Sequence, residues 1–267
     1  MHESQLPAWT RNPWILGGLV FLLAVAISAQ SILGGVKHFD ASGIEYTRYN
    51  NYVIFRQSFA HLVAGRDLYV LYPSEHWDLF KYSPAFALLM APIAVVPDFA
   101  GLVLWNFCNA AVLCFALWSL PSLTESRRLF ALVFVSVEMV TSLQSAQSNA
   151  LIAGLFILAF VQLEKKHVLL ATLGIALTVA IKPFGIVAFA MLLLDPGRLR
   201  AALYAIAWLV LLAALPLVVV DLAQLEFLYR RWYESGCIAS SAFARSCSRQ
   251  RFCGWSSSTT KPSRRPM

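Results

Sequence analysis

Several stretches of about twenty residues without a charged side chain limit what this chain can fold into. They include Trp14 to Leu33, Gly101 to Leu120 and Ala201 to Val220. A helix of this length crosses the roughly 30 Å hydrocarbon core of a bilayer, and it satisfies its own backbone hydrogen bonds there. The sequence therefore predicts an all-α, polytopic transmembrane helical bundle.

The composition agrees with a membrane protein and argues against other classes. Hydrophobic residues make up 59% of the chain and charged residues only 13%, and the mean hydropathy is +0.65. The net charge of +7 could suggest nucleic-acid binding, but the basic residues lie between the apolar segments and form no basic stripe. We therefore expect no nucleic-acid partner. The cysteines show no CxxC pair or metal-ligand spacing, so we expect no metal site.

The first apolar stretch, Trp14 to Leu33, is interpreted as a retained membrane span. A cleavable signal peptide would have a shorter apolar region that ends in small residues. Residues 24–26 offer a weak site of that kind, so cleavage remains the alternative. In the retained interpretation, residues 1–13 form a cytoplasmic N-terminus.

Residues 14–233 are interpreted as one transmembrane domain with about seven or eight membrane segments. Ser83 to Val96 is short and contains Pro84 and Pro92, so we expect a re-entrant segment, with a thin span as the alternative. The other stretches are Leu129 to Leu143, Ala150 to Leu163 and Val168 to Leu194, the last interrupted at Lys182 and Pro183.

The basic residues between these segments predict the orientation. Short connections rich in Lys and Arg stay in the cytoplasm. Such connections contain Arg127 and Arg128, Lys165 and Lys166, and Arg198 and Arg200. We therefore predict a multi-pass protein of the cell (inner) membrane, in which residues 34–82 form a large first external loop and residues 144–149 lie on the same outer face.

The first external loop is long enough to carry function. Tyr52, Phe55, Phe59 and Leu62 recur every three or four residues, which predicts an amphipathic helix on the membrane surface. Gly65 is expected to end this helix.

Short elements in this loop and beyond it resemble those of glycosyltransferase family 87. The loop contains a G-x-D-L-Y element at residues 65–69 and a K-Y-S-P element at residues 81–84. A Q-x-N-x-L element follows at residues 147–151, and a K-P element at residues 182–183. The resemblance covers residues 14 to 233, with the elements in the family's order.

This resemblance implies a membrane hexosyltransferase of the GT-C class with a juxtamembrane helix in its first external loop. Such an enzyme moves a sugar, typically mannose, from a polyprenyl-phosphate donor to a glycan or glycolipid acceptor at the external face of the lipid bilayer. A carboxylate serves as general base, and cationic groups stabilise the departing phosphate. No metal or cofactor is required, because the leaving group is a lipid phosphate.

The general base is the point at which the sequence departs from the family. The family's usual base is an Asp of the first loop, and the matching position holds Asn51, which cannot act as a base. Asp40 and Glu45 are the nearest upstream carboxylates and are the predicted catalytic residues. The alternative for both is a solvated loop acid.

Other polar residues of the loop are candidates for substrate binding, each with a structural alternative. Asp67 can instead cap the turn after Gly65. Asp78 and Lys81 stand at pairing distance on a helix. The candidates in this loop are Asn51, Asp67, Tyr69, His76, Asp78, Lys81 and Tyr82.

Lys182 and Glu138 lie within apolar stretches, where ionisable residues are functional candidates. Lys182 precedes Pro183 and is predicted to bind the donor phosphate, with snorkelling of its long side chain as the alternative. Glu138 is predicted to begin a polar stripe that lines a cavity, with helix–helix contacts as the alternative. The stripe continues through Ser142, Ser145 and Asn149, and Gln147 completes the substrate-binding candidates.

Residues 234–267 differ from the rest of the chain. Residues 235–267 contain nine Ser, three Cys and six Lys or Arg but no acid, and cannot build a core. We interpret this tail as out of frame, so that the transmembrane domain is truncated; a genuine basic tail is the alternative. Reading the coding DNA in the other two frames beyond codon 233 tests this interpretation.

Two other functions remain open. A transporter or lipid-linked-sugar flippase would use Lys182 and Glu138 along its pathway, but no repeated halves are visible in the sequence. An inactive remnant that binds lipid would explain Asn51 and the tail.

Overall fold

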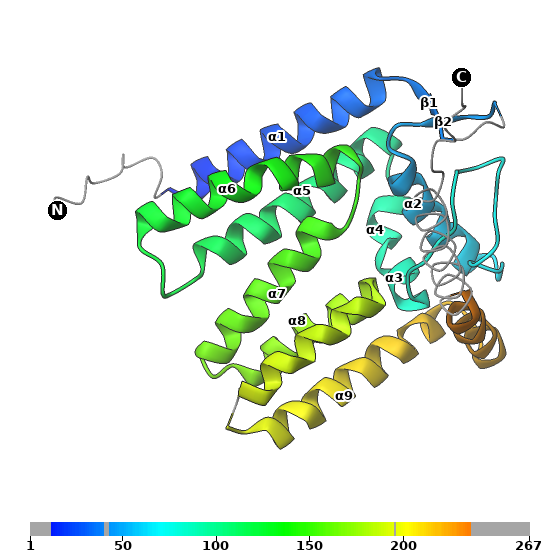
Figure 1. The fold of residues 1–267 in the computed structure, drawn as a ribbon. Helices are drawn as coiled ribbons and strands as arrows, with labels where there is room; N and C mark the ends of the chain where they lie inside the picture. The colour runs from blue at the N-terminus through cyan, green and yellow to red at the C-terminus, as the bar shows by residue number, and fades with distance from the viewer. Residues whose placement is uncertain (1–11, 40–42, 195, 236–267) are drawn as a thin grey trace, which may run out of the picture.

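The fold is a bundle of antiparallel and crossing helices, seen in a computed structural model that describes residues 12–39, 43–194 and 196–235 (Figure 1). The long helices coincide with the apolar stretches of the sequence. They are α1 (Pro13–Leu33), α5 (Asp98–Trp118), α6 (Glu125–Gln144), α7 (Asn149–Glu164), α8 (Val168–Ile181) and α9 (Arg198–Ala214). Two 3-10 segments, η2 (Pro183–Leu194) and η3 (Leu215–Val218), follow α8 and α9.

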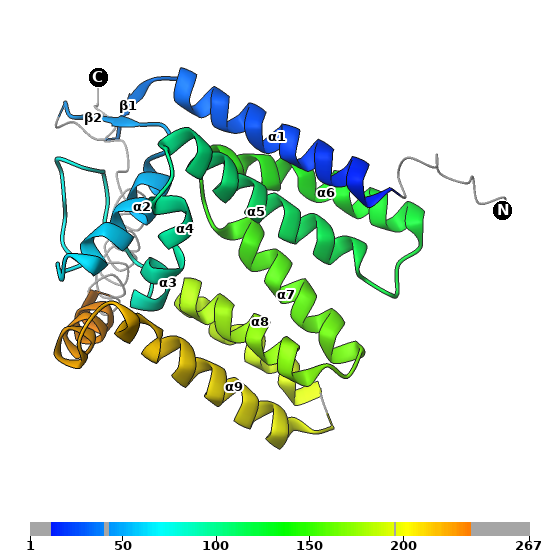
Figure 2. The same ribbon diagram turned by 180° about the vertical axis from the view of Figure 1, so that it is seen from behind.

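The helices pack in a sequence of neighbouring pairs. Helix α1 lies against α5 and α6, α5 lies against α7, and α8 lies between α7 and α9 (Figures 1 and 2). Glycine permits the closest of these contacts. A Cβ atom at Gly154 of α7 would stand only 2.8 Å from the backbone nitrogen of Leu113 in α5. The absence of a side chain at Gly154 therefore brings the two helix backbones together.

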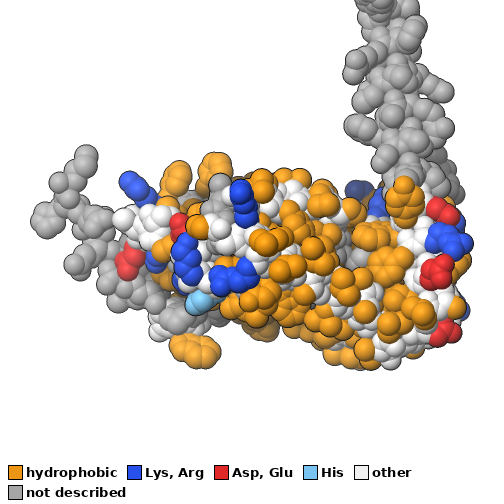
Figure 3. All heavy atoms as spheres, turned by 90° about the horizontal axis from the view of Figure 1, so that it is seen from below, with side chains coloured by type: hydrophobic (Ala, Val, Ile, Leu, Met, Phe, Trp, Pro, Cys, Tyr) orange, Lys and Arg blue, Asp and Glu red, His pale blue; other side chains and the backbone are white. Residues whose placement is uncertain are grey.

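Three of the described helices are long and apolar enough to cross a membrane: Trp14–Leu33, Asp98–Trp118 and Arg198–Val218. Their outward faces are apolar. The neighbouring helix α6 also has an apolar outward face, on which Phe130, Phe134 and Val137 are largely exposed. Figure 3 shows hydrophobic side chains across the middle of one face, with most of the Lys and Arg side chains toward one end and acidic and basic side chains together at the other. Apolar surface of this extent is typical of contact with lipid.

The two ends of the bundle differ in chemistry. The connections α5–α6, α7–α8 and η2–α9 lie at one end, and they carry the basic residues of the short loops. The first loop, the α6–α7 turn and the end of α8 lie together at the other end (Figure 1). The side chain of Asn51 in the first loop donates to the Ser145 carbonyl in the α6–α7 turn at 2.7 Å. The two segments that the sequence placed on one face therefore do meet.

The first loop is not purely helical. Strands β1 (Val36–His38) and β2 (Glu45–Thr47) form a short antiparallel hairpin, with Val36 opposite Thr47. Helix α2 (Asn50–Val63) follows and ends before Gly65, whose φ of +66° is readily adopted only by glycine. The all-α prediction is therefore correct for the bundle and incomplete for the loop.

Helix α2 corrects one expectation. Tyr52, Phe55 and Leu62 form its apolar stripe as predicted, but they are fully buried in the protein, with Phe59 partly buried beside them. Phe55 meets Tyr82, Phe86 and Trp105 edge to face at ring distances of 4.9 to 5.3 Å. The stripe packs on the bundle because these aromatic side chains, distant in sequence, cover it.

Residues 83–96 form two short helices, α3 (Pro84–Leu89) and α4 (Ala91–Ala94). Pro92 interrupts the segment, and neither helix is long enough to cross a bilayer. Ser83 caps α3 by accepting from the Phe86 amide at 3.1 Å, and its hydroxyl donates to the Ala180 carbonyl of α8 at 2.6 Å. The segment is thus fastened to the end of α8.

Residues 222–235 are helical, and Arg231 there joins Asp67 of the first loop by an ion pair of 2.8 Å. The tail from residue 236 onward, and residues 1–11 of the N-terminus, lie outside the described residues. The prediction that the tail is out of frame therefore stays a prediction.

Candidate functional site

A cavity of about 330 Å³ opens at the end of the bundle that carries the first loop. Its walls come from α2, from residues 78–82, from the α6–α7 turn and from the junction of α8 with η2. The residues that line it are Asn51, Ile54, Phe55, Asp78, Leu79, Lys81, Tyr82, Gln147, Lys182, Pro183 and Phe184. Six of them, Asn51, Asp78, Lys81, Tyr82, Gln147 and Lys182, are substrate-binding candidates from the sequence.

Lys182 enters this cavity because the helix stops there. Pro183 cannot donate a backbone hydrogen bond, so α8 ends at Ile181 and Lys182 takes an extended conformation (φ −138°, ψ 134°). Its ammonium nitrogen donates to the Asn149 side-chain oxygen at 2.8 Å. The same nitrogen lies 5.8 Å from the centre of the Tyr82 ring and 5.6 Å from that of Phe184. The cation therefore has one neutral hydrogen-bond acceptor and two aromatic neighbours, and no ion-pair partner among the described residues.

The α6–α7 turn supplies the amide side of the cavity. Ala146 has a φ of +49°, and the Trp105 ring nitrogen donates to its carbonyl at 3.0 Å, which anchors this strained turn to α5. The backbone N–H of Gln147 donates to the Ser142 carbonyl at 2.8 Å. The Gln147 side chain has no hydrogen-bond partner within the described part of the chain, so its amide is available to a ligand.

Residues 76–81 are held in place by two side chains. Asn50 bonds to the Trp77 backbone twice, donating to its carbonyl at 2.6 Å and accepting from its amide at 2.9 Å. His76 is buried and its Nδ1 lies 3.0 Å from the Asp78 carbonyl, where the protonated nitrogen donates. These contacts stabilise Asp78 in a left-handed conformation with a φ of +81°.

Asp78 is the one acid among the described residues that line the cavity. One carboxylate oxygen accepts from the Lys81 ammonium at 2.6 Å, and the other accepts from the Leu79 amide at 2.8 Å. The pair forms in a loop and not on a helix, because the backbone reverses at Asp78 and brings Lys81 back toward it. Both side chains remain partly open to solvent, so a ligand can reach them.

Tyr82 forms the apolar floor beneath these groups. Its ring stacks on Phe86 at 4.7 Å, and burial raises the pKa of its hydroxyl to about 12. The hydroxyl therefore stays protonated at neutral pH and can donate a hydrogen bond.

A comparison with known protein families identifies the family of the chain. A model of glycosyltransferase family 87 matches residues 80–257, a range that contains Lys81, Tyr82, Gln147 and Lys182. The chain belongs to glycosyltransferase family 87. Family 87 membership indicates a glycosyltransferase. The matched range also extends into the tail, which the structure does not describe. No curated protein and no solved structure is significantly similar to the chain.

Two other candidates of this family 87 chain have structural contacts outside the cavity. Asp67 accepts from the Tyr69 amide at 2.9 Å, which is the turn role expected after Gly65, and its second oxygen accepts from Arg231 at 2.8 Å. The Tyr69 hydroxyl donates to the Tyr82 carbonyl at 2.9 Å. The G-x-D-L-Y element thus supports the cavity from behind, through the backbone of Tyr82.

The two carboxylates predicted as bases do not line the cavity. Glu45 is exposed on β2, where its carboxylate lies 3.5 Å from the His38 ring nitrogen. Asp40 falls outside the described residues. In this family 87 chain, the acid that the fold brings to the cavity is Asp78.

The expected polar stripe from Glu138 does not form. Helix α6 ends at Gln144, so Asn149 begins a different helix, and Ser145 lies in the turn between them. Glu138 is exposed on the outer side of α6, and Ser142 is buried. Counting helical steps fails here because the chain turns sharply at Ala146.

Sequence reasoning did not single out Asn50, Phe184 or Ile54. Asn50 is the neighbour of Asn51, and this doublet at the start of an amphipathic helix was the available signal. Ile54 and Phe184 are apolar residues, and the hydrophobic pattern of the sequence does not distinguish apolar residues that line a cavity from those of the core.

Proposed function

We propose that the cavity transfers a sugar, mannose by family resemblance, from a polyprenyl-phosphate donor to a hydroxyl group of a glycan or glycolipid acceptor. The observation that carries the proposal is that Lys182 and Asp78 line the same cavity although they are 104 positions apart in the sequence. One group is suited to the departing phosphate, and the other to the attacking hydroxyl.

Lys182 is suited to the donor phosphate because its ammonium has no acid to neutralise it among the described residues. It projects from the end of the apolar helix α8, where we expect a lipid phosphate to meet the hydrocarbon. Negative charge grows on that phosphate as the sugar leaves, and a fixed cation stabilises it. Asn149 orients the ammonium, and the Tyr82 and Phe184 rings stabilise the cation.

Asp78 is suited to act as general base. In the reaction, the acceptor hydroxyl gives its proton to the carboxylate while its oxygen bonds to the anomeric carbon. The bond from that carbon to the phosphate oxygen breaks, and its electron pair stays on the phosphate. Asn51, at the position of the family's usual base, lines the same cavity as Asp78. A carboxylate at position 78 can therefore serve an acceptor in the same space.

A second cavity of about 330 Å³ supports a lipid donor. Its walls are apolar and come from α3, α4, α5, α7 and α8; they include Phe86, Met90, Ile93, Leu104, Trp105, Leu155, Leu177 and Ile181. It adjoins the polar cavity, because Phe86 stacks on Tyr82 and Ile181 immediately precedes Lys182. A polyprenyl chain in this space would place its phosphate beside Lys182.

We propose that the reaction takes place at the external face of a multi-pass protein of the cell (inner) membrane. The short basic connections lie at the end of the bundle opposite the cavity, and such connections stay in the cytoplasm.

The proposal is tested with membranes that contain the full chain and radiolabelled polyprenyl-phosphate mannose. We expect label to pass to an added glycan or glycolipid acceptor, and Asp78→Asn to abolish the transfer while the donor still binds. Movement of labelled donor across the bilayer without transfer would support the transporter alternative and overturn the proposal. Donor binding without transfer to any acceptor would support the inactive remnant.

A further inference from the structure

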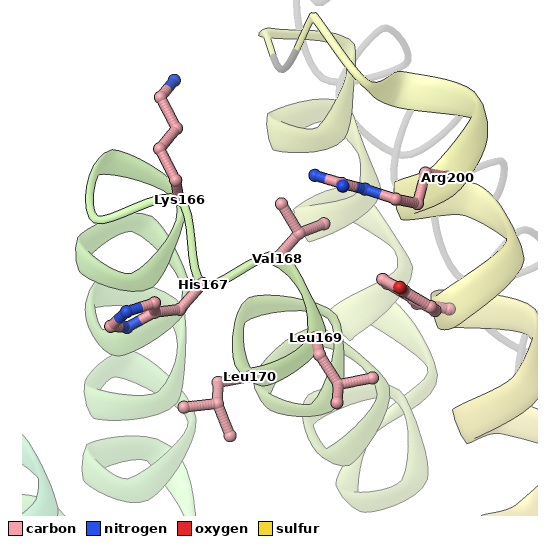
Figure 4. Close-up of a pocket in the computed structure, with 7 residues that line it drawn as sticks. Lys166, His167, Val168, Leu169, Leu170 and Arg200 are labelled. Carbon is pink, nitrogen blue, oxygen red and sulfur yellow. The ribbon is translucent and has the colours of Figure 1, made fainter.

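A second charged hollow lies at the opposite end of α8 from Lys182. It has a volume of about 370 Å³ and lies between the α7–α8 turn, the start of α8 and the first turns of α9 (Figure 4). Helix α8 has 14 residues, so the two sites are separated by roughly 20 Å. The residues that line it are Lys166, His167, Val168, Leu169, Leu170, Arg200 and Tyr204.

The cations of this hollow are available to a ligand. Lys166 and Arg200 are exposed, and neither has an ion-pair partner among the described residues. The segments 164–170 and 198–204 together contain four Lys or Arg and a single acid, Glu164. Figure 4 shows the Arg200 guanidinium extending from α9 across the gap toward the start of α8, with Lys166 on the turn beside it. The flexible side chain of Lys166 can turn toward the same gap.

The His167 ring does not point into the gap between α8 and α9. Its Nδ1 lies 3.0 Å from the Gln162 side-chain oxygen, and Figure 4 shows the ring directed away from α9. The cationic part of the hollow is therefore the pair Lys166 and Arg200, reinforced by the partial positive charge at the N-terminus of α8.

The other side of the hollow is apolar and open. Leu169 and Leu170 are 49% and 52% exposed, although they belong to the first turn of an otherwise buried helix. Tyr204 stands beside them on α9, an arrangement typical of the level where lipid headgroups meet hydrocarbon. A free phosphate ion would gain nothing from these leucines, whereas an acyl chain would cover them.

We propose that this hollow binds the phosphate headgroup of an anionic phospholipid, with the acyl chains along Leu169 and Leu170. Basic pockets between transmembrane helices at the cytoplasmic face recognise lipid phosphates in this way. The bound lipid joins the α7–α8 turn to α9, and thereby fixes the two helices that flank η2. The site binds a lipid of the surrounding bilayer and not the sugar donor, so this proposal does not depend on the proposed transfer reaction.

The test uses the full chain, purified in detergent, with phosphatidylglycerol as the probe and native mass spectrometry to measure retained lipid. The variant Lys166→Gln/Arg200→Gln removes the two cations of the hollow. The variant Lys165→Gln/Arg198→Gln removes the same charge from neighbouring residues that do not line it. We expect affinity to fall roughly tenfold or more in the first variant, and to change little in the second.

Three further measurements decide between sources of phosphate and guard against misfolding. Phosphatidylcholine, inorganic phosphate and glycerophosphoglycerol are expected to bind far more weakly than phosphatidylglycerol. The charge-preserving variant Lys166→Arg/Arg200→Lys is expected to retain the lipid. Equal losses in both Gln variants would overturn the proposal in favour of general charge attraction, and inorganic phosphate binding as tightly as the lipid would overturn it in favour of a simple anion site.

Discussion

The ammonium of Lys182 donates to the side-chain oxygen of Asn149 at 2.8 Å. This contact joins two sequence elements, one at the broken end of α8 and one at the start of α7, that are 33 positions apart. It orients a cation that lines the cavity at the first-loop end of the bundle. The amide accepts the hydrogen bond without neutralising the charge, so the ammonium remains attractive to a phosphate.

Lys182→Ala is expected to weaken binding of the polyprenyl-phosphate donor by roughly tenfold or more, because a charge-assisted contact to phosphate is among the stronger polar interactions. Lys165→Ala is the matched control, since Lys165 is exposed in the α7–α8 turn. Equilibrium binding of labelled donor to membranes measures both. Equal effects of the two changes would indicate that Lys182 only snorkels.

Asp78→Asn is expected to lower the rate of transfer by about a hundredfold or more, because the loss of a positioned base typically costs this much. The amide retains the acceptor for the Leu79 backbone, so the loop should keep its conformation. Glu45→Gln is the control, because Glu45 is exposed on β2 and outside the cavity. Single-turnover kinetics distinguish the two. A loss confined to Glu45→Gln would return the base to the upstream loop.

Single cysteines test the orientation of the bundle in a background that lacks the native cysteines. A cysteine at Gln147 should react with a membrane-impermeant reagent on intact cells, whereas one at Lys165 should react only after permeabilisation. The physical reason is that basic connections stay in the cytoplasm. The reverse pattern would show that the cavity faces the cytoplasm.

The stability of the first loop is expected to depend on His76. Burial lowers the pKa of His76 below its ordinary value of 6.5, against the opposing influence of the Asp78 carbonyl and of nearby Glu75. The folded state then binds fewer protons than the unfolded state, so stability is complete above about pH 6.5 and falls as the pH decreases further. Thermal unfolding in detergent at pH 8 and pH 5.5 measures the loss.

His76→Gln should reduce this pH dependence, because it removes the buried imidazole. Part of the dependence is expected to persist in His76→Gln, since burial also lowers the pKa of His61. An unchanged profile in His76→Gln would exclude a contribution from this residue.

Gly154→Ala is expected to destabilise the bundle by about 1–3 kcal/mol, the usual cost of overpacking a tight contact. The added Cβ would lie 2.8 Å from the Leu113 backbone nitrogen and 2.9 Å from its Cα, and neither backbone atom can move without shifting α5. Gly17→Ala in α1 is the control, because nothing lies within 4 Å of its Cβ position. Denaturation in detergent should separate the two variants; similar stabilities would mean that α5 and α7 can move apart freely.

The sequence alone determined which stretches of the chain form the long helices, to within a few residues at their ends. Apolar stretches without charged residues have the length of membrane-spanning helices. Pro183 ends α8 at Ile181, and Gly65 stands two residues after the end of α2. These effects act within a few residues, so they can be read from the sequence. The four elements that resemble family 87 could be recognised for the same reason, since each is a short run of consecutive residues. The family match agrees with that recognition.

Only the tertiary structure decided which of these residues meet. Glu45 and Asp78 are both loop acids in the sequence, yet only Asp78 lines the cavity, because Asn50 and His76 fold its loop back over α2. Glu138 and Asn149 do not share a helix face, because α6 ends at Gln144 and the chain turns sharply at Ala146. The apolar stripe of α2 is covered by Phe86 and Trp105 rather than by lipid. Such outcomes depend on contacts between residues tens of positions apart, and no local pattern in the sequence encodes them.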